Sequence, residues 1–292
     1  MPGPSKLRAF RLLSRRDVLL APLALRLLAC RSGESPPTDG GKAPPSSAAG
    51  GPWAATSGSN GPLADAEREA PALAPLDAVT VGTRTGQGGV LAVLLHGWGA
   101  PGDDLVPLAR ALAHPDARFV VPAAPLERAR GGRAWWHLDG GDRPKQAWSD
   151  ELPAGHRPHP AVSAARTAVQ RLLRGAIEQY APERTVLAGF SQGAMLALDV
   201  ALHGDPAVHG VAVLSGALLA DSLAALRSAR RPRPSVLVAH GRQDPVVPFA
   251  AGESIPRMLS AHGIDVTWVP FEGGHGIPPL VVERLKRFLV QS

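Results

Sequence analysis

Residues 185–193 read TVLAGFSQG, an apolar run followed by a serine that stands between two glycines. The apolar run predicts a buried strand, and the pattern that starts at Gln192 predicts a helix. A G-x-S-x-G motif between a strand and a helix is typical of a sharp turn that projects the serine hydroxyl at the helix N-terminus. A chain with 32 glycines makes the bare motif weak evidence, but its position strengthens it. We therefore predict that Ser191 is a nucleophile.

Short apolar runs alternate with amphipathic stretches on both sides of this motif. Strands are predicted at residues 90–95, 119–121, 185–188, 211–214, 236–239 and 266–269. Helices are predicted at residues 104–113, 161–180, 192–202, 249–262 and 280–289. Pro256 is expected to kink or split the fourth of these helices. Continuous apolar strands that alternate with helices indicate an α/β fold, with a mostly parallel sheet and helices on both faces.

A serine hydroxyl needs a neighbouring base, and the base needs a group that orients it. In folds with this strand–turn–helix motif the partners follow the serine in the order acid, then histidine. Asp244 lies in HGRQDPVVP, just past the predicted strand 236–239, and His275 lies in GGHGIPP, just past the last predicted strand. Both would therefore stand at carboxyl ends of strands, as Ser191 does. We predict that His275 accepts the serine proton and that Asp244 orients the imidazole.

Other acids and histidines downstream of the serine are weaker candidates for these two roles. Asp199 falls within a predicted helix, and Asp265 opens a strand instead of following one. The remaining histidines lie at helix ends or at the start of a loop, where capping or structural roles are expected: His203, His209, His240 and His262.

Acyl transfer also requires hydrogen-bond donors for the oxyanion that develops on the substrate. One predicted donor is the backbone N–H of Gln192, directly after the nucleophile. The second is expected in the loop that follows an early strand. That loop reads HGWGA over residues 96–100, and it places the backbone N–H of Trp98 at the expected position.

Several blocks of the chain resemble those of the phospholipase/carboxylesterase family, which includes acyl-protein thioesterases and small bacterial carboxylesterases. They are LLHGWGAPGDDLVPLA, GFSQGAMLALDVAL, HGRQDPVVP and EGGHGIPPLV, in the family's order, together with GGRAWWHL, which resembles its Trp-containing segment beside the cleft. The resemblance covers residues 76–290 and implies the α/β-hydrolase fold, with no large lid, no metal and no cofactor. The implied small-molecule substrates are short or single-chain acyl esters, lysophospholipids and acyl thioesters.

The GGRAWWHL block contains two adjacent tryptophans, Trp135 and Trp136. Two neighbouring side chains in an extended loop are not expected to point inward together. One of them is therefore expected to line the acyl groove, and packing in the core is the alternative.

The composition speaks against a nucleic-acid partner and a metal centre. The net charge is +6, but residues 1–29 carry six basic residues and one acid, so the rest of the chain is close to neutral. A near-neutral domain lacks an electrostatic footprint for phosphate backbones. The single cysteine, Cys30, excludes an intramolecular disulfide and a cysteine metal cluster. His156 and His159, in GHRPHP, are interpreted as part of a solvated loop.

The first thirty residues have the layout of a bacterial signal peptide. A basic segment precedes an apolar run, residues 18–25, that is too short to span a bilayer. SRRDVLL resembles the twin-arginine export motif, and LLAC, which ends at Cys30, resembles a lipobox whose cysteine is lipidated. Arg26 interrupts the apolar stretch, and a fortuitous basic arm is the alternative interpretation.

Three segments follow from these patterns. Residues 1–29 are predicted to be a signal peptide, residues 30–75 a disordered tether rich in Pro, Gly, Ser and Ala, and residues 76–292 the catalytic domain. The chain is then expected to be exported and anchored to a membrane through its lipidated N-terminus, facing the periplasm or the exterior.

The sequence predicts a serine hydrolase of carboxylic esters or thioesters that works through an acyl-enzyme. Two alternatives stay open, because a fold does not choose its chemistry. One is a membrane-tethered binding protein on a non-catalytic hydrolase scaffold. The other is a hydrolase of different specificity, such as a peptidase or a polyester depolymerase.

Overall fold

The computed structural model of the protein describes residues 76–82, 88–138, 143–147, 149, 151–228 and 233–291. The predicted signal peptide, the predicted tether and Cys30 all lie outside this part of the chain. Among the described residues, no helix has the length and apolar character needed to cross a bilayer.

A seven-stranded sheet with the strand order β1-β3-β2-β6-β7-β8-β9 forms the centre of the fold. Its strands are β1 (Ala78–Gly82), β2 (Val90–Leu95), β3 (Ala117–Pro122), β6 (Arg184–Phe190), β7 (Gly210–Leu214), β8 (Ser235–Gly241) and β9 (Val266–Phe271). All neighbouring strands are parallel except the edge strand β1, which pairs with β3 in the antiparallel sense. A separate two-stranded ribbon joins β4 (Leu126–Glu127) to β5 (Arg133–Ala134).

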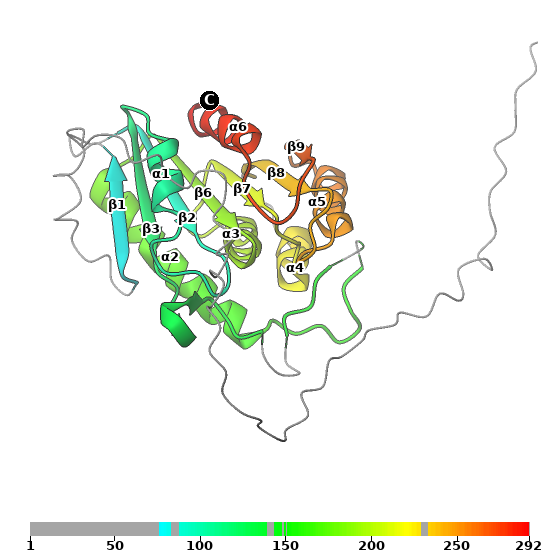
Figure 1. The fold of residues 1–292 in the computed structure, drawn as a ribbon. Helices are drawn as coiled ribbons and strands as arrows, with labels where there is room; N and C mark the ends of the chain where they lie inside the picture. Colours follow the sequence, from blue (N-terminus) through cyan, green and yellow to red (C-terminus); the bar gives the residue numbers. More distant parts are fainter. Residues whose placement is uncertain are drawn as a thin grey trace, which may run out of the picture. The chain divides into compact units, whose positions relative to one another are not determined.

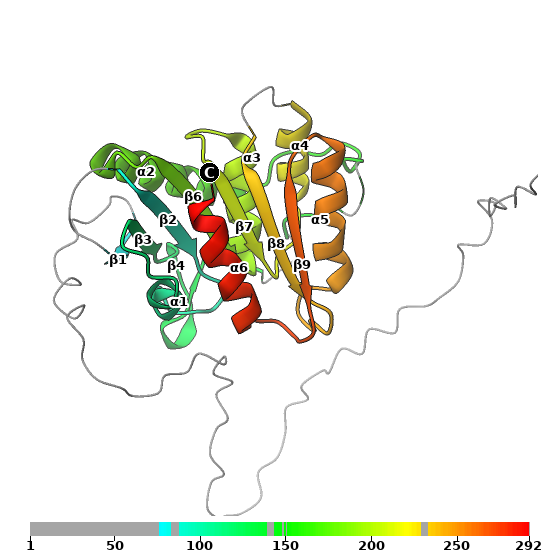
Figure 2. The ribbon, with the colours of Figure 1, turned by 90° about the horizontal axis from the view of Figure 1, so that it is seen from above.

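Helices cover both faces of the sheet, as Figures 1 and 2 show. They are α1 (Val106–Ala111), α2 (Pro160–Tyr180), α3 (Gln192–His203), α4 (Ala220–Ser228), α5 (Phe249–Ala261) and α6 (Pro279–Val290). One apolar cluster packs α2, α3, α4 and α5 against one face, and a second packs α1 and α6 against the other. This two-sided burial explains the continuous apolar runs of the central strands, and it confirms the predicted fold class.

Helix α5 narrows the expectation for Pro256, which was that the proline would kink or split the helix. Pro256 lies inside α5, and the helix is not split, since it runs from Phe249 to Ala261. A proline removes a single N–H from the helix ladder and crowds the preceding turn. The side chains of Ile255, Met258 and Leu259 are buried on both sides of it, and their packing against the sheet holds the helix together.

The topology brings four loops to one edge of the sheet. The loops after β2, β6, β8 and β9 leave the carboxyl ends of parallel strands, and they contain the HGWGA segment, Ser191, Asp244 and His275 respectively. In open α/β sheets this edge is where sites form. The fold thus gathers the residues that the sequence marks as chemically active.

Candidate active site

The turn between β6 and α3 holds Ser191 in a strained backbone conformation. Its φ is 55° and its ψ is −117°, a region that residues other than glycine rarely adopt. The flanking glycines make this turn possible. A Cβ atom on Gly189 would collide with the carbonyl of Gly193, and one on Gly193 would collide with the carbonyls of Leu95 and His96. The close packing of these backbones fixes Ser191 at the N-terminus of α3.

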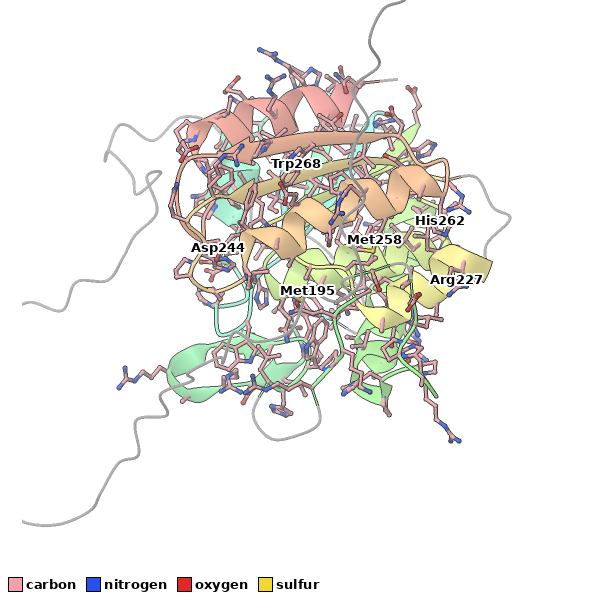
Figure 3. All side chains as sticks on the ribbon, turned by 90° about the vertical axis from the view of Figure 1, so that its right-hand side faces the viewer. Met195, Arg227, Asp244, Met258, His262 and Trp268 are labelled. Carbon is pink, nitrogen blue, oxygen red and sulfur yellow. The ribbon has the colours of Figure 1, made fainter. Side chains whose placement is uncertain are left out.

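Asp244 and His275 form a close pair on the neighbouring loops. The Nδ1 atom of His275 donates to Oδ2 of Asp244 over 2.7 Å. The other carboxylate oxygen accepts two backbone N–H groups, from Val246 at 2.8 Å and Val247 at 2.9 Å. Figure 3 labels Asp244 on the loop that follows β8. Because Nδ1 carries the proton of this hydrogen bond, the Nε2 atom of His275 is left able to accept one.

Ser191 and His275 line the same cavity, which has a volume of about 480 Å³. The ring of Phe190 packs against the imidazole of His275 with the ring centroids 4.7 Å apart. No hydrogen bond joins the Ser191 hydroxyl to His275 in the described part of the chain. In unliganded active sites such bonds are often long and tighten only around a substrate. The arrangement can deliver a serine hydroxyl, a base and a carboxylate to one reacting group.

The loop after β2 is held by a buried histidine. His96 donates from Nδ1 to the carbonyl of Gly97 at 2.8 Å, and its Nε2 accepts the N–H of Ala124 at 3.0 Å. This leaves Trp98 on the cavity wall, where Gln192 also lies. No hydrogen bond to another described residue engages the backbone N–H of Trp98. The two predicted oxyanion donors therefore come from loops that meet beside Ser191.

One tryptophan lines the cavity, as expected, but both are buried, which was not expected. Trp135 and Trp136 are each only 1% exposed, so two adjacent tryptophans can point inward together here. Trp136 lines the cavity while Trp135 does not. The Trp135 indole instead donates to the carbonyl of His96 at 2.9 Å. The chain bends sharply enough after the β4–β5 ribbon for both rings to be buried.

The Gln192 side chain makes two hydrogen bonds to the backbone of the tryptophan segment, a role that the sequence did not suggest. Its Oε1 accepts the N–H of Trp135 at 3.0 Å, and its Nε2 donates to the carbonyl of Trp136 at 2.8 Å. A side chain amide can satisfy one backbone donor and one backbone acceptor in this way. The residue after the nucleophile thus fixes the tryptophan segment to the start of α3.

Further cavity residues were also missed, among them two charged side chains. Asp104 and Arg143 both line the cavity, and burial raises the pKa of Asp104 above its usual value. Apolar side chains form much of the remaining wall, namely Trp136, Leu138, Met195, Leu219 and Val247. These residues come from separate segments of the chain, so no local pattern in the sequence could have grouped them.

The rival acids and histidines serve other purposes. Asp199 on α3 is fully buried and is paired with Arg166 on α2 at 2.7 Å. Ser222 on α4 also donates to Asp199, at 2.9 Å, so this carboxylate holds three helices together. Asp265 is exposed, and His209 accepts the N–H of Thr185. Within the residues that are described, no cluster of His, Cys, Asp and Glu is suited to a metal ion.

Two fully buried histidines give the domain a pH-dependent stability. Burial lowers the pKa of both His96 and His240 below the ordinary value of 6.5. The folded state therefore keeps both rings neutral where the unfolded chain already takes up protons. Stability is fully present above about pH 6.5 and is lost as the pH falls below it.

We expect the free energy of unfolding to drop between pH 7.5 and pH 5.5, by roughly 1 kcal/mol for each of the two histidines. Urea unfolding at both pH values measures the drop in the wild type. His240→Gln removes one titrating ring, and its drop should be smaller than that of the wild type. A drop of the same size in this variant would contradict the assignment to His240.

Comparisons with known proteins place the chain in a family of hydrolases. Residues 81–292 match the model of a family described as phospholipase/carboxylesterase. The acyl-protein thioesterase 1 of Kluyveromyces lactis is 28% identical over 190 residues, which make up 61% of this chain and 79% of that protein. The crystal structure of esterase PE8 is 29% identical with a TM-score of 0.60, covering 73% of this chain and 97% of that one.

A carboxylesterase of Bacillus cereus, 21% identical, has a TM-score of 0.55 over 74% of this chain and 94% of its own, which shows a shared fold alone. All the residues that line the cavity fall inside the range that the family model matches.

Proposed function

Because the chain belongs to the phospholipase/carboxylesterase family and is a serine hydrolase of esters or thioesters, we propose that Ser191, His275 and Asp244 are its catalytic triad. The observation that carries the proposal is the 2.7 Å hydrogen bond between His275 and Asp244, at a cavity that Ser191 also lines. The strained turn at Ser191 adds to it, because such strain persists mainly where a function requires it.

The proposed reaction proceeds through an acyl-enzyme. Ser191 Oγ attacks the acyl carbon while its proton passes to Nε2 of His275. The imidazolium that forms is stabilised by Asp244, and it then protonates the leaving alcohol or thiol. A water molecule, activated by the same imidazole, attacks the acyl-enzyme and releases the carboxylic acid. The tetrahedral intermediates carry an oxyanion, which we place between the backbone N–H groups of Trp98 and Gln192.

The cavity wall supports an acyl chain as the group that the enzyme holds. Apolar side chains make up much of the wall, and burial of each methylene of an acyl chain contributes about 0.8 kcal/mol. We infer that single-chain acyl esters and acyl thioesters are the substrates. Acyl-protein thioesterases among the relatives make a thioester substrate a specific candidate.

A substrate panel tests the reaction class. The panel contains p-nitrophenyl esters of increasing acyl length, an acyl thioester and a lysophospholipid. They are compared with a peptide p-nitroanilide whose side chain is similar in size to the acyl chain of the esters. Hydrolysis of the esters and the thioester, with kcat/KM rising with acyl length until the cavity is filled, is the expected result. Turnover of the anilide in preference to the esters would indicate a peptidase, and turnover of none would indicate a binding protein.

We also propose that the enzyme is exported and held at a membrane by a lipidated Cys30. The support is the sequence alone: the basic segment, the twin arginines, the short apolar run and the LLAC block of residues 27–30. A single acyl chain binds membranes only marginally, whereas several chains on one cysteine give stable attachment.

Replacing the cysteine tests this localisation. The full-length wild type, expressed in a bacterium, should fractionate with membranes. Its intact mass should be that of a chain that starts at Cys30 and carries acyl groups on this residue. Cys30→Ala should be released from the membrane or remain unprocessed, with kcat/KM for a soluble ester unchanged. An unprocessed wild-type N-terminus in the soluble cytoplasmic fraction would contradict the proposal and would leave the hydrolase assignment intact.

A further inference from the structure

A second buried imidazole approaches the carboxylate of Asp244. His240 is a fully buried residue near the end of β8, and its Nε2 atom lies 3.3 Å from Oδ2 of Asp244. The same nitrogen lies 2.9 Å from the carbonyl oxygen of Val247. Oδ2 is also the oxygen that accepts the hydrogen bond from His275. The carboxylate therefore stands between two imidazoles, of which only His275 lines the cavity.

The surroundings of His240 fix its tautomer. Both groups that face Nε2 are acceptors, so Nε2 carries the ring's proton. The opposite nitrogen, Nδ1, is buried and has no hydrogen-bond partner among the described residues. Protonation there would bury a charge and an unsatisfied donor, at a cost that an apolar interior does not repay. The ring is therefore neutral, and its single N–H points to the Asp244 loop.

The helix α5 is shaped to hold this ring. Gly252 lies against it, and a Cβ atom at that position would collide with Nδ1. Phe249 contacts the ring edge-on, with the centroids 6.1 Å apart. Among the described residues, the charged and titratable groups that act on His240 are Asp244 and His275, and α5 presents Gly252 and Phe249 to it. The imidazole therefore has one position, beneath the carboxylate.

We propose that His240 is a positioning residue of the active site, which shares its Nε2 proton between Asp244 and Val247 and so sets the orientation and basicity of the Asp244 carboxylate. The inference rests on the proposed triad. The shared proton draws negative charge from Oδ2, which limits how strongly Asp244 holds a protonated His275. It also fixes Val247, whose backbone N–H donates to Asp244 and whose side chain lines the cavity. One ring thus supports both the carboxylate and the cavity wall.

Three substitutions separate this role from simple packing. Gln places its amide nitrogen at about the reach of Nε2, so His240→Gln keeps the donor. Asn is shorter and places its amide nitrogen near the position of Nδ1, so His240→Asn has no donor at the position of Nε2. His240→Leu keeps the apolar volume and has no donor at all. Active sites are counted with a fluorophosphonate, so that kcat is expressed for each folded site.

With p-nitrophenyl butyrate we expect His240→Leu and His240→Asn to lose about 10- to 100-fold in kcat, as for loss of a hydrogen bond to a charged group. Their KM should stay within about 3-fold of the wild type, because the ring does not line the cavity. The acid limb of their pH–rate profiles should move up by roughly half a pH unit, because the freed carboxylate stabilises the protonated His275. His240→Gln should stay within about 5-fold of the wild type, with its acid limb in place.

The proposal is overturned if His240→Leu keeps the wild-type kcat per labelled site and the wild-type acid limb, or if Gln and Asn behave alike. Should the variants not fold, the wild type still decides. Imidazole nitrogen NMR must find His240 neutral, with its proton on Nε2, down to about pH 5.5, whereas a proton on Nδ1 or a ring charged at pH 6.5 contradicts the proposal.

Ser191→Ala separates a failure of the proposed triad from a failure of the proposed role of His240. Activity in Ser191→Ala refutes the triad, whereas an inactive Ser191→Ala with a normal His240→Leu refutes only the role of His240.

Discussion

Ser191→Ala should reduce kcat/KM for p-nitrophenyl butyrate by at least about 10⁴-fold, because the members of a nucleophile–base–acid unit do not act separately. The serine hydroxyl is the only group that the substitution removes. His275 and Asp244 keep their hydrogen bond, but the base then has no serine hydroxyl to activate. The measurement is a comparison of initial rates over a range of substrate concentration, corrected for the uncatalysed reaction.

The fold of this variant should survive. Ser191 lies at the start of α3 with its side chain at the cavity, and the turn depends on the flanking glycines and on the N–H of Ser191, which donates to the carbonyl of Leu214 at 2.9 Å. Alanine keeps this N–H and adopts the strained backbone about as well as serine. An unchanged circular dichroism spectrum and midpoint of thermal unfolding are the controls. Wild-type activity in a folded Ser191→Ala protein would refute the nucleophile.

Asp244→Asn should cost about 10⁴-fold in kcat, the scale known for this substitution in serine proteases, even though the two side chains have the same shape. Among the described residues, the carboxylate accepts two backbone N–H groups on Oδ1 and the His275 imidazole on Oδ2, and Nε2 of His240 lies 3.3 Å from the same Oδ2. An amide must turn its NH₂ toward one of these donors. If it faces His275, it stabilises the tautomer whose proton sits on Nε2, and that nitrogen can no longer accept the serine proton.

The matched control for this prediction is Asp199→Asn. Like that of Asp244, the carboxylate of Asp199 is fully buried, but its ion-pair partner is Arg166 and it lies on α3 outside the cavity lining. We expect Asp199→Asn to lower stability while each folded molecule keeps its kcat. A loss of kcat per folded site as large as that of Asp244→Asn would indicate that the effect is one of general packing. A small effect of Asp244→Asn would remove Asp244 from the triad.

The central sheet could be predicted because most of its strands leave a pattern within a short stretch of the sequence. The central parallel strands show continuous apolar runs, and the parallel strands, including the half-buried edge strand β9, end at the same edge of the sheet, which is why Ser191, Asp244 and His275 could be grouped from their positions in the chain. The edge strand β1 was missed because its residues are only half-buried, so its sequence has no such run. Helix α4 was missed for a different reason: most of its residues are buried, but its pattern is short and weakly amphipathic.

The contacts that hold the proposed active-site residues and the cavity wall in place could not be predicted from local patterns. Gln192 holds Trp135 from 57 positions away in the sequence, and His96 accepts the indole N–H of Trp135 from 39 positions away. Contacts of this kind depend on how separate segments fold together, and they leave no periodicity behind. His240 shows the limit most clearly. The sequence indicates a histidine at the start of a loop, while its contact with the same carboxylate as His275 exists only in three dimensions.

If the acyl group is transferred to Ser191, a reagent that mimics the acyl group must form a covalent bond with this serine. The wild-type protein is treated with a fluorophosphonate, and the modified peptide is located by mass spectrometry after digestion. We expect one adduct per molecule, on Ser191, with ester hydrolysis lost in proportion to labelling and no adduct in Ser191→Ala. Labelling of any other residue with the same loss of activity, or full activity in the completely labelled protein, would contradict it.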